Sequence, residues 1–221
     1  MPFPLLSLLV PALGAPAAGL GYAFARRRRA SEARRWGERR RQEQDDRREA
    51  LSAATGGRLR LCEPEEIQAG LTGERVWSLP LLGPEDISRF RQGLREIAGR
   101  RGFPPDRLDD LCSCVSEAAG GALGRGQGGV AQVWASDEGF SVLVTDCGRG
   151  IAPEALLGLT DGPEGVFFGA GQGREPLAFQ LLLALSDTVS LSTGEEGTQI
   201  LLHIRSRPAE DTAASGWVQA A

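Results

Sequence analysis

The chain has 221 residues, the length of one domain of ordinary size with appended segments, and its formal net charge is −4. All 25 residues in its lysine-plus-arginine total are arginines, which excludes a phosphate-clamping lysine and leaves that role to arginine. Its cysteines have no histidine or third thiol at metal-ligand spacing, so they are expected to be small buried side chains in a reducing compartment. They are Cys62, Cys112, Cys114 and Cys147.

The first segment, residues 1–25, contains no charged side chain and is followed by the run Arg26–Arg29. About twenty apolar residues can span a bilayer as a helix, and positive charge after the segment favours an outside N-terminus and a cytoplasmic remainder. We therefore expect a single-pass N-terminal anchor, with the rest of the chain on the cytoplasmic face of the inner membrane. A misassigned start codon or a disordered apolar tail is the alternative, and the protein is then cytoplasmic.

Residues 26–56 are rich in arginine and in helix formers but have almost no apolar side chain on any helical face. The segment is therefore predicted to be a juxtamembrane helix or linker that core packing does not hold. Its arginines suit anionic headgroups. Nucleic acid is not an expected partner, because the segment lacks interleaved aromatic residues other than Trp36 and has no reading motif.

The globular domain is predicted at residues 57–207. Alternating residues at 58–62 and 75–81 predict two strands on one edge of a sheet. An amphipathic helix follows at 83–99, with Ile87, Phe90 and Leu94 at helical spacing. A second apolar helix at 108–123 carries one glutamate near its end, Glu117. The adjacent Gly120 and Gly121 predict that this helix ends early.

The second half of the domain alternates short apolar runs with glycine-rich turns. A hairpin turn at 136–139 joins strands predicted at 130–135 and 140–145. A long loop rich in glycine and proline covers 152–173 and precedes a helix at 174–185. Strands at 187–192 and 198–204 form a final hairpin, and residues 208–221 are predicted to be a disordered tail.

The strand at 140–145 leads into Asp146, which is followed by Gly148, Gly150 and Ile151. A carboxylate at the end of a strand with a glycine turn beside it makes a small pocket floor with one fixed acceptor. Glycine serves there because it tolerates positive φ or because it lets backbone approach closely. A simple β-turn with aspartate at its first position is the alternative.

Four motifs follow one another along the chain: the helix with Glu117, Asp146-x-Gly-x-Gly-Ile151, Gly169-x-Gly-x-Gly173 before a helix, and Gly197-Thr198. This series resembles the Bergerat-fold (GHKL, histidine-kinase-like) ATPases over residues 75–205. Within them it is most similar to the anti-sigma-factor serine/threonine kinases and the switch kinases. The resemblance implies an α/β two-layer sandwich with a mixed, mostly antiparallel sheet covered on one face by helices.

The resemblance also implies roles in binding ATP. Asp146 would accept the adenine amino group, with Gly148, Gly150 and Ile151 forming its turn. Thr198 would support the adenine contact through its hydroxyl. Glu117 would be the catalytic base. The phosphates would be wrapped by Gly169, Gly171 and Gly173 at the start of a helix.

One departure concerns the metal. The family holds Mg²⁺ with an asparagine four residues after the glutamate, where this chain has Gly121. Any Mg²⁺ would then rest on water and phosphate, so losing this ligand should impair phosphoryl transfer more than binding. Glu117 itself has an alternative role as a helix glutamate that pairs with an arginine or faces solvent.

The expected function is therefore that of a regulatory ATP-binding domain. It would control a partner such as a sigma factor or an anti-sigma antagonist by binding, and by phosphorylation if it is an active serine/threonine kinase. The alternative is a degenerate, non-catalytic interaction module anchored at the membrane. His203, the only histidine, alternates within a strand and is expected to be an edge-strand polar residue, which excludes a self-contained histidine kinase. The sequence leaves homodimerisation open.

Overall fold

The structure is a computed structural model that describes residues 35, 38–39, 41–126, 128–151 and 175–207. Its internal contacts divide the chain into two units, Met1–Arg47 and Arg48–Ala221. In the first unit the described residues are helical and mostly exposed. No helix among the described residues has the length and apolar character needed to cross a membrane. The anchor predicted at residues 1–25 and the tail predicted at 208–221 lie outside the described residues.

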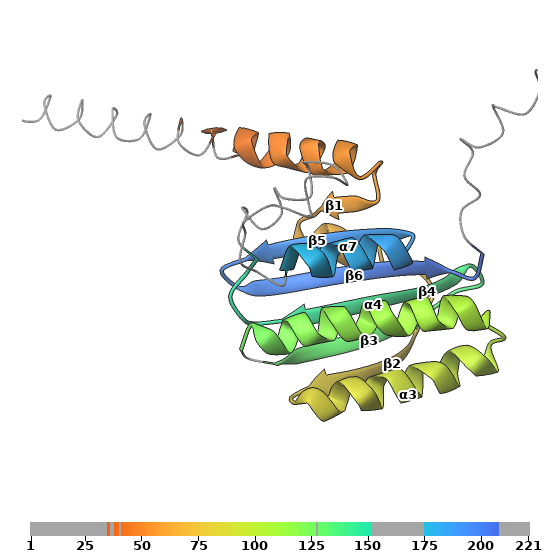
Figure 1. The fold of residues 1–221 in the computed structure, drawn as a ribbon. Coiled ribbons are helices and arrows are strands. Elements are labelled where there is room, and N and C mark those ends of the chain that lie inside the picture. The colour runs from red at the N-terminus through yellow and green to blue at the C-terminus, as the bar shows by residue number, and fades with distance from the viewer. Residues whose placement is uncertain (1–34, 36–37, 40, 127, 152–174, 208–221) are drawn as a thin grey trace, which may run out of the picture. The chain divides into compact units, whose positions relative to one another are not determined.

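A six-stranded sheet forms the centre of the second unit (Figure 1). Its strands are β1 (Leu59–Leu61), β2 (Glu74–Leu81), β3 (Gly129–Ala135), β4 (Gly139–Asp146), β5 (Thr188–Gly194) and β6 (Gly197–Arg205). Their order across the sheet is β1-β5-β6-β4-β3-β2. Only the β1–β5 pair is parallel, so the predicted mixed, mostly antiparallel sheet is confirmed.

The two edge strands differ from expectation in their placement. We expected residues 58–62 and 75–81 on the same edge, but β1 and β2 lie on opposite edges of the sheet. The intervening chain forms a short helix, α2 (Pro64–Ala69), and passes from one edge to the other. Both edges are poor templates, because β1 has only three residues and β2 contains Pro80, which has no N–H to donate.

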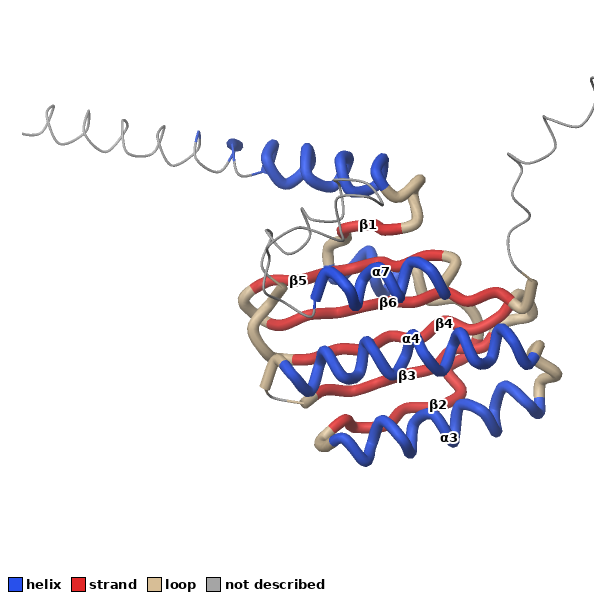
Figure 2. The backbone as a smooth tube through the Cα atoms, viewed as in Figure 1, coloured by secondary structure: helices blue, strands red, loops and turns tan. Residues whose placement is uncertain are grey.

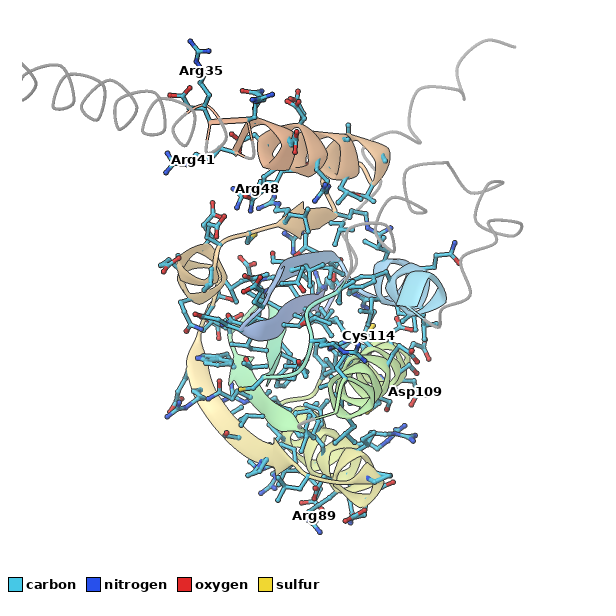
Figure 3. The ribbon with its side chains drawn as sticks, turned by 90° about the vertical axis from the view of Figure 1, so that its left-hand side faces the viewer. Arg35, Arg41, Arg48, Arg89, Asp109 and Cys114 are labelled. Atoms are coloured by element: carbon cyan, nitrogen blue, oxygen red, sulfur yellow. The ribbon has the colours of Figure 1, made fainter. Side chains whose placement is uncertain are left out.

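Three helices cover one face of the sheet side by side (Figures 1 and 2). They are α3 (Pro84–Arg100), α4 (Pro105–Gly124) and α7 (Glu175–Leu185). Their apolar faces and the facing side chains of the strands form the main core. The helix α2 lies against the other face, where Ile67 packs on Leu143 and Leu201 (Figure 3). We expected helices on one face only. This is correct for α3, α4 and α7, but α2 lies on the other face.

The central helix α4 runs to Gly124 and does not end early as predicted. Gly120 and Gly121 are both helical, at a cost of about 1 kcal/mol each relative to alanine. The buried side chains of the same helix, among them Leu111, Val115 and Ala118, have no exposed area or almost none. Burying a large apolar side chain contributes about 1.5–3 kcal/mol, so packing outweighs local propensity.

The N-terminal helix also differs from expectation where it enters the second unit. Residues 48–54 are helical, and Leu51 is fully buried in the main core. We predicted that core packing would not hold this segment, but it does hold the segment's last turns. The helix stops before Gly56 and Gly57, whose φ angles are +60° and +78°, values that glycine tolerates.

A partly buried arginine ties the N-terminal end of α4 to the end of the sheet. The Arg107 guanidinium donates to Asp110 at 2.9 Å and to Asp187 at 2.7 Å. Its Nε also donates to the main-chain carbonyl of Arg205, at 3.2 Å. Because the planar guanidinium offers several donors in fixed directions, one side chain joins α4, β6 and the loop before β5.

The cysteines are only in part the buried side chains that we expected. Cys112 and Cys114 are buried, whereas Cys62 is half-buried and Cys147 is exposed. The Cys114 sulfur lies between α4 and α7 (Figure 3), 4.0 Å from the Leu182 carbonyl oxygen. Burial raises the pKa of the Cys114 thiol to about 12, and nearby Asp110 adds to the rise, so this thiol stays protonated and inert.

His203 is not on an edge strand as predicted, because β6 lies between β5 and β4. Its Nδ1 is 2.8 Å from the Ser141 hydroxyl, which is 3.1 Å from the Thr72 hydroxyl. Burial lowers the pKa of His203, and the nearby arginines Arg205 and Arg60 lower it further against a weaker opposing effect of Asp187. The imidazole is therefore neutral in the native state near pH 7.

A first prediction concerns two glycines of α3. A Cβ on Gly93 would lie 2.4 Å from the Trp77 ring, and that ring stacks on Phe90 with centroids 4.7 Å apart. Overpacking there costs about 1–3 kcal/mol, more than the roughly 1 kcal/mol that alanine gains in a helix. Gly93→Ala should therefore lower the free energy of unfolding measured with urea. Gly99→Ala, where a Cβ meets nothing within 4 Å, is the control and should raise it; equal effects would contradict the packing argument.

A second prediction concerns acid stability. Because the pKa of His203 is lowered in the native state, the unfolded chain binds more protons below the ordinary histidine pKa of about 6.5. The free energy of unfolding should fall as the pH drops from 7.5 to 5.5, by at most about 1.4 kcal/mol per pH unit from this group. Chemical denaturation of His203→Gln should show a flatter dependence over that range. A slope identical to that of the unchanged chain would remove His203 as the cause.

Candidate functional site

The predicted base-reading residue, Asp146, is the last residue of β4. In the antiparallel register its partner on β6 is Thr198. Both side chains are almost fully buried, with exposed fractions of 2% and 1%. The sheet therefore brings together two side chains that lie far apart in the sequence, as the resemblance implied.

The Asp146 carboxylate accepts three hydrogen bonds from the residues that the structure describes. Its Oδ1 accepts the Gly148 N–H at 2.9 Å. Its Oδ2 accepts from Arg125 Nε at 3.0 Å and from Arg125 Nη2 at 2.7 Å. The exposed fractions of the two charged side chains are 10% for Arg125 and 1% for Asp146. The result is a buried, hydrogen-bonded ion pair at the end of β4.

Arg125 was missed in the sequence analysis. It follows α4 directly and forms the C-cap of that helix, where a positive side chain interacts favourably with the helix dipole. In the sequence it stands between Gly124 and Gly126, in a stretch that reads as a flexible connector. The only hint of its role was a single positive charge at the end of the helix that carries Glu117. Its partner, Asp146, lies 21 residues further along the chain, so the sequence alone does not reveal the pair.

Two glycines make room for Arg125. A Cβ on Gly148 would lie 2.8 Å from both Cβ and the carbonyl oxygen of Arg125. A Cβ on Gly121 would lie 3.1 Å from Arg125 Nη1, whereas a Cβ on Gly120 would meet nothing within 4 Å. The residue at the expected metal-ligand position is therefore in contact with the guanidinium.

The turn after Asp146 needs glycine for close approach and not for unusual φ. Neither Gly148 nor Gly150 has a positive φ angle. A Cβ on Gly150 would lie 2.4 Å from the main-chain oxygen of Gly194. The Ile151 N–H donates to the Thr193 hydroxyl at 2.6 Å. The turn is thus fixed against the β5–β6 hairpin.

Thr193 is a second residue that the sequence analysis missed. Its hydroxyl lies 3.4 Å from that of Thr198, so a short chain of hydroxyls links the turn at Ile151 to the strand opposite Asp146. A serine- and threonine-rich strand gave no signal for this contact, because it depends on the register of β5 with β6, in which Thr193 faces Thr198.

Glu117 lies on α4, one turn before Gly121 and two turns before Arg125, and its side chain is partly exposed. Among the described residues no arginine forms an ion pair with it. The alternative in which Glu117 pairs with a nearby arginine is therefore not found among the described residues. Arg125 connects the helix that carries Glu117 to the strand that ends at Asp146.

The remaining predicted site residues, Gly169, Gly171 and Gly173, lie outside the described residues. Within the described ranges, no three histidine, cysteine, aspartate or glutamate side chains are grouped so that they could hold a metal ion. A phosphate loop at 169–173 accordingly stays a prediction.

Comparison with known proteins identifies the family. The family model described as histidine kinase-like ATPase domain matches residues 82–204, more than half of the 221-residue chain. The match begins just before α3 and ends within β6, so it includes Glu117, Asp146 and Thr198. A search of the curated proteins finds no match. From the family match and the observed sheet, the chain belongs to the histidine kinase-like ATPase domain family.

Proposed function

We propose that this chain is a regulatory domain of the anti-sigma-factor serine kinase type, and that it controls its partner mainly by binding. The observation that carries the proposal is the replacement of a metal ligand by Gly121, whose open face the Arg125 guanidinium occupies. The family implies an ATP-binding domain. The geometry at this position supports binding functions better than phosphoryl transfer.

The described residues do not fit an adenine ring in the arrangement found. The Asp146 carboxylate, which would accept the adenine amino hydrogen, is buried. Its Oδ1 already accepts a hydrogen bond from Gly148, and its Oδ2 accepts two from Arg125. A carboxylate can accept about four hydrogen bonds in total. With 2% of Asp146 exposed, no accessible acceptor is left for a base.

The site also offers little support for a metal-dependent reaction. Phosphoryl transfer depends on Mg²⁺ to neutralise charge between the β- and γ-phosphates. At the position where the family places an asparagine ligand, this chain has a glycine beside a positively charged guanidinium. A nearby cation repels Mg²⁺, so both the missing ligand and the local charge oppose the metal.

An active serine/threonine kinase is the second candidate. Glu117 favours it, because this glutamate is partly exposed and has no ion-pair partner among the described residues. A carboxylate in that state is free to act as a base toward a hydroxyl. This candidate requires Mg²⁺ to be held by water and phosphate alone.

The proposed partner is a regulatory protein such as a sigma factor or an anti-sigma antagonist. The proposal includes attachment to the cytoplasmic face of the inner membrane through residues 1–25, which are uncharged and precede an arginine run. Support for both comes from the sequence and from the family resemblance.

The third prediction separates the two candidates. Isothermal titration of the full chain with ATP should give weak binding that Mg²⁺ strengthens by less than about threefold, because no side chain at position 121 holds the metal. The unchanged chain and a Glu117→Gln variant should capture the same partner from native cytoplasm in a pulldown. Neither should transfer phosphate from MgATP to that partner. Mg²⁺-strengthened binding together with Glu117-dependent phosphate transfer to the partner would instead establish the kinase.

A further inference from the structure

We propose that Arg125 sets the nucleotide affinity of this domain: its guanidinium holds the Asp146 carboxylate, and ATP binds only when Arg125 leaves it. The inference rests on the proposed function, because it concerns the same site. It goes further by naming an internal residue that competes with the nucleotide. The observation is the ion pair itself, with Arg125 Nη2 2.7 Å from Asp146 Oδ2.

The competition follows from hydrogen-bond chemistry. The adenine amino group and the guanidinium are both donors, and each needs the same acceptor oxygen. Arg125 already donates to that oxygen through two nitrogens, at 3.0 and 2.7 Å. Both donors would meet a charged acceptor, but the guanidinium also carries a positive charge and donates through two nitrogens, whereas the adenine amino group is neutral. To bind, adenine therefore has to displace the guanidinium from Asp146, and it offers the carboxylate a weaker donor in exchange.

The burial of the pair makes the replacement harder. Removing one partner from a buried ion pair leaves an uncompensated charge, which is strongly unfavourable. The exposed fractions of the two side chains are only 10% and 1%. Arg125 thus leaves Asp146 in a minor population of molecules, and the observed affinity for ATP is reduced by that fraction.

Gly121 belongs to the same arrangement. A Cβ at this position would lie 3.1 Å from Arg125 Nη1, closer than an ordinary van der Waals contact. A larger side chain there would occupy space now taken by the guanidinium. The glycine that replaces the metal ligand is therefore also the residue that lets Arg125 reach Asp146.

The neighbouring glycine provides a matched control. Gly120 is in the same helix, is exposed, and has no atom within 4 Å of its Cβ position. Substitutions at 120 and 121 share the change in helix propensity. They differ in whether they displace Arg125.

The fourth prediction is measured by isothermal titration of the full-length chain with ATP in EDTA. Arg125→Gln and Gly121→Asn should each bind ATP at least about tenfold more tightly than the unchanged chain, because the competing donor is removed or displaced. Arg101→Gln, which removes an exposed arginine at the end of α3, and Gly120→Asn should leave the affinity unchanged. Working in EDTA excludes any effect of restoring a metal ligand at 121.

Gly121→Ala keeps Arg125 and covers the case in which Arg125→Gln fails to fold. Its Cβ only crowds Nη1, so it should give a smaller gain in ATP affinity than Gly121→Asn, and Gly120→Ala should give none. Circular dichroism melts establish which variants are folded. A purely structural ion pair would change the melting temperature without changing ATP affinity in EDTA.

One result would overturn the inference: folded variants at 125 and 121 that bind ATP in EDTA no more tightly than the unchanged chain. The proposed function fails on a different measurement, Glu117-dependent phosphate transfer from MgATP to the captured partner by the unchanged chain. The two failures are therefore distinguishable.

Discussion

The ion pair between Arg125 and Asp146 is the interaction on which the arrangement of the site depends. It joins the C-terminal end of α4 to the end of β4, two elements that carry different parts of the predicted machinery. At the opposite end of α4, Arg107 makes a comparable connection to Asp187. The central helix is thus fixed at each end by a guanidinium that is at most partly exposed. In a chain without lysine, the planar, multiply donating side chain fills both positions.

The same pair explains how the fold can be stable without a bound nucleotide. The sheet, the three covering helices and the register of Asp146 with Thr198 follow from apolar burial and strand pairing. None of these depends on a nucleotide. An internal cation satisfies the buried carboxylate, so the fold carries no unpaired charge where a ligand would otherwise be needed. Stability of the domain is thereby separated from occupancy of its site.

Local pattern predicted most of the fold. The short runs at 140–145 and 198–204 predicted β4 and β6, although β4 is buried on both faces. The helical spacing of Ile87, Phe90 and Leu94 predicted α3 because it marks the face that packs on the core. The six-residue α2 was missed because only Ile67 is buried, which gives no periodicity. The edge positions of β1 and β2 were wrong because β1 pairs with β5, about 130 residues away in the sequence, and no local pattern reports such a pairing.

Only part of the arrangement around Asp146 could be predicted from the sequence. Asp146 and Thr198 were singled out because glycine turns mark them, and the sheet places them opposite each other. Their role in binding ATP stays a prediction. Arg125 and Thr193 act through contacts that depend on tertiary register, so their residue types alone carry no signal. The Gly120–Gly121 pair was given too much weight, since core packing along α4 overrides its low helix propensity.

The two edge strands of the sheet, β1 and β2, restrict how another protein can bind this domain. Proteins often recruit an extended peptide by letting it continue an existing sheet through main-chain hydrogen bonds. Here the edge strand β1 has only three residues, and the edge strand β2 is interrupted by Pro80. Neither border offers an uninterrupted row of donors and acceptors. Recognition through side chains on the helices or the connecting turns is consequently the favoured mode for this molecule.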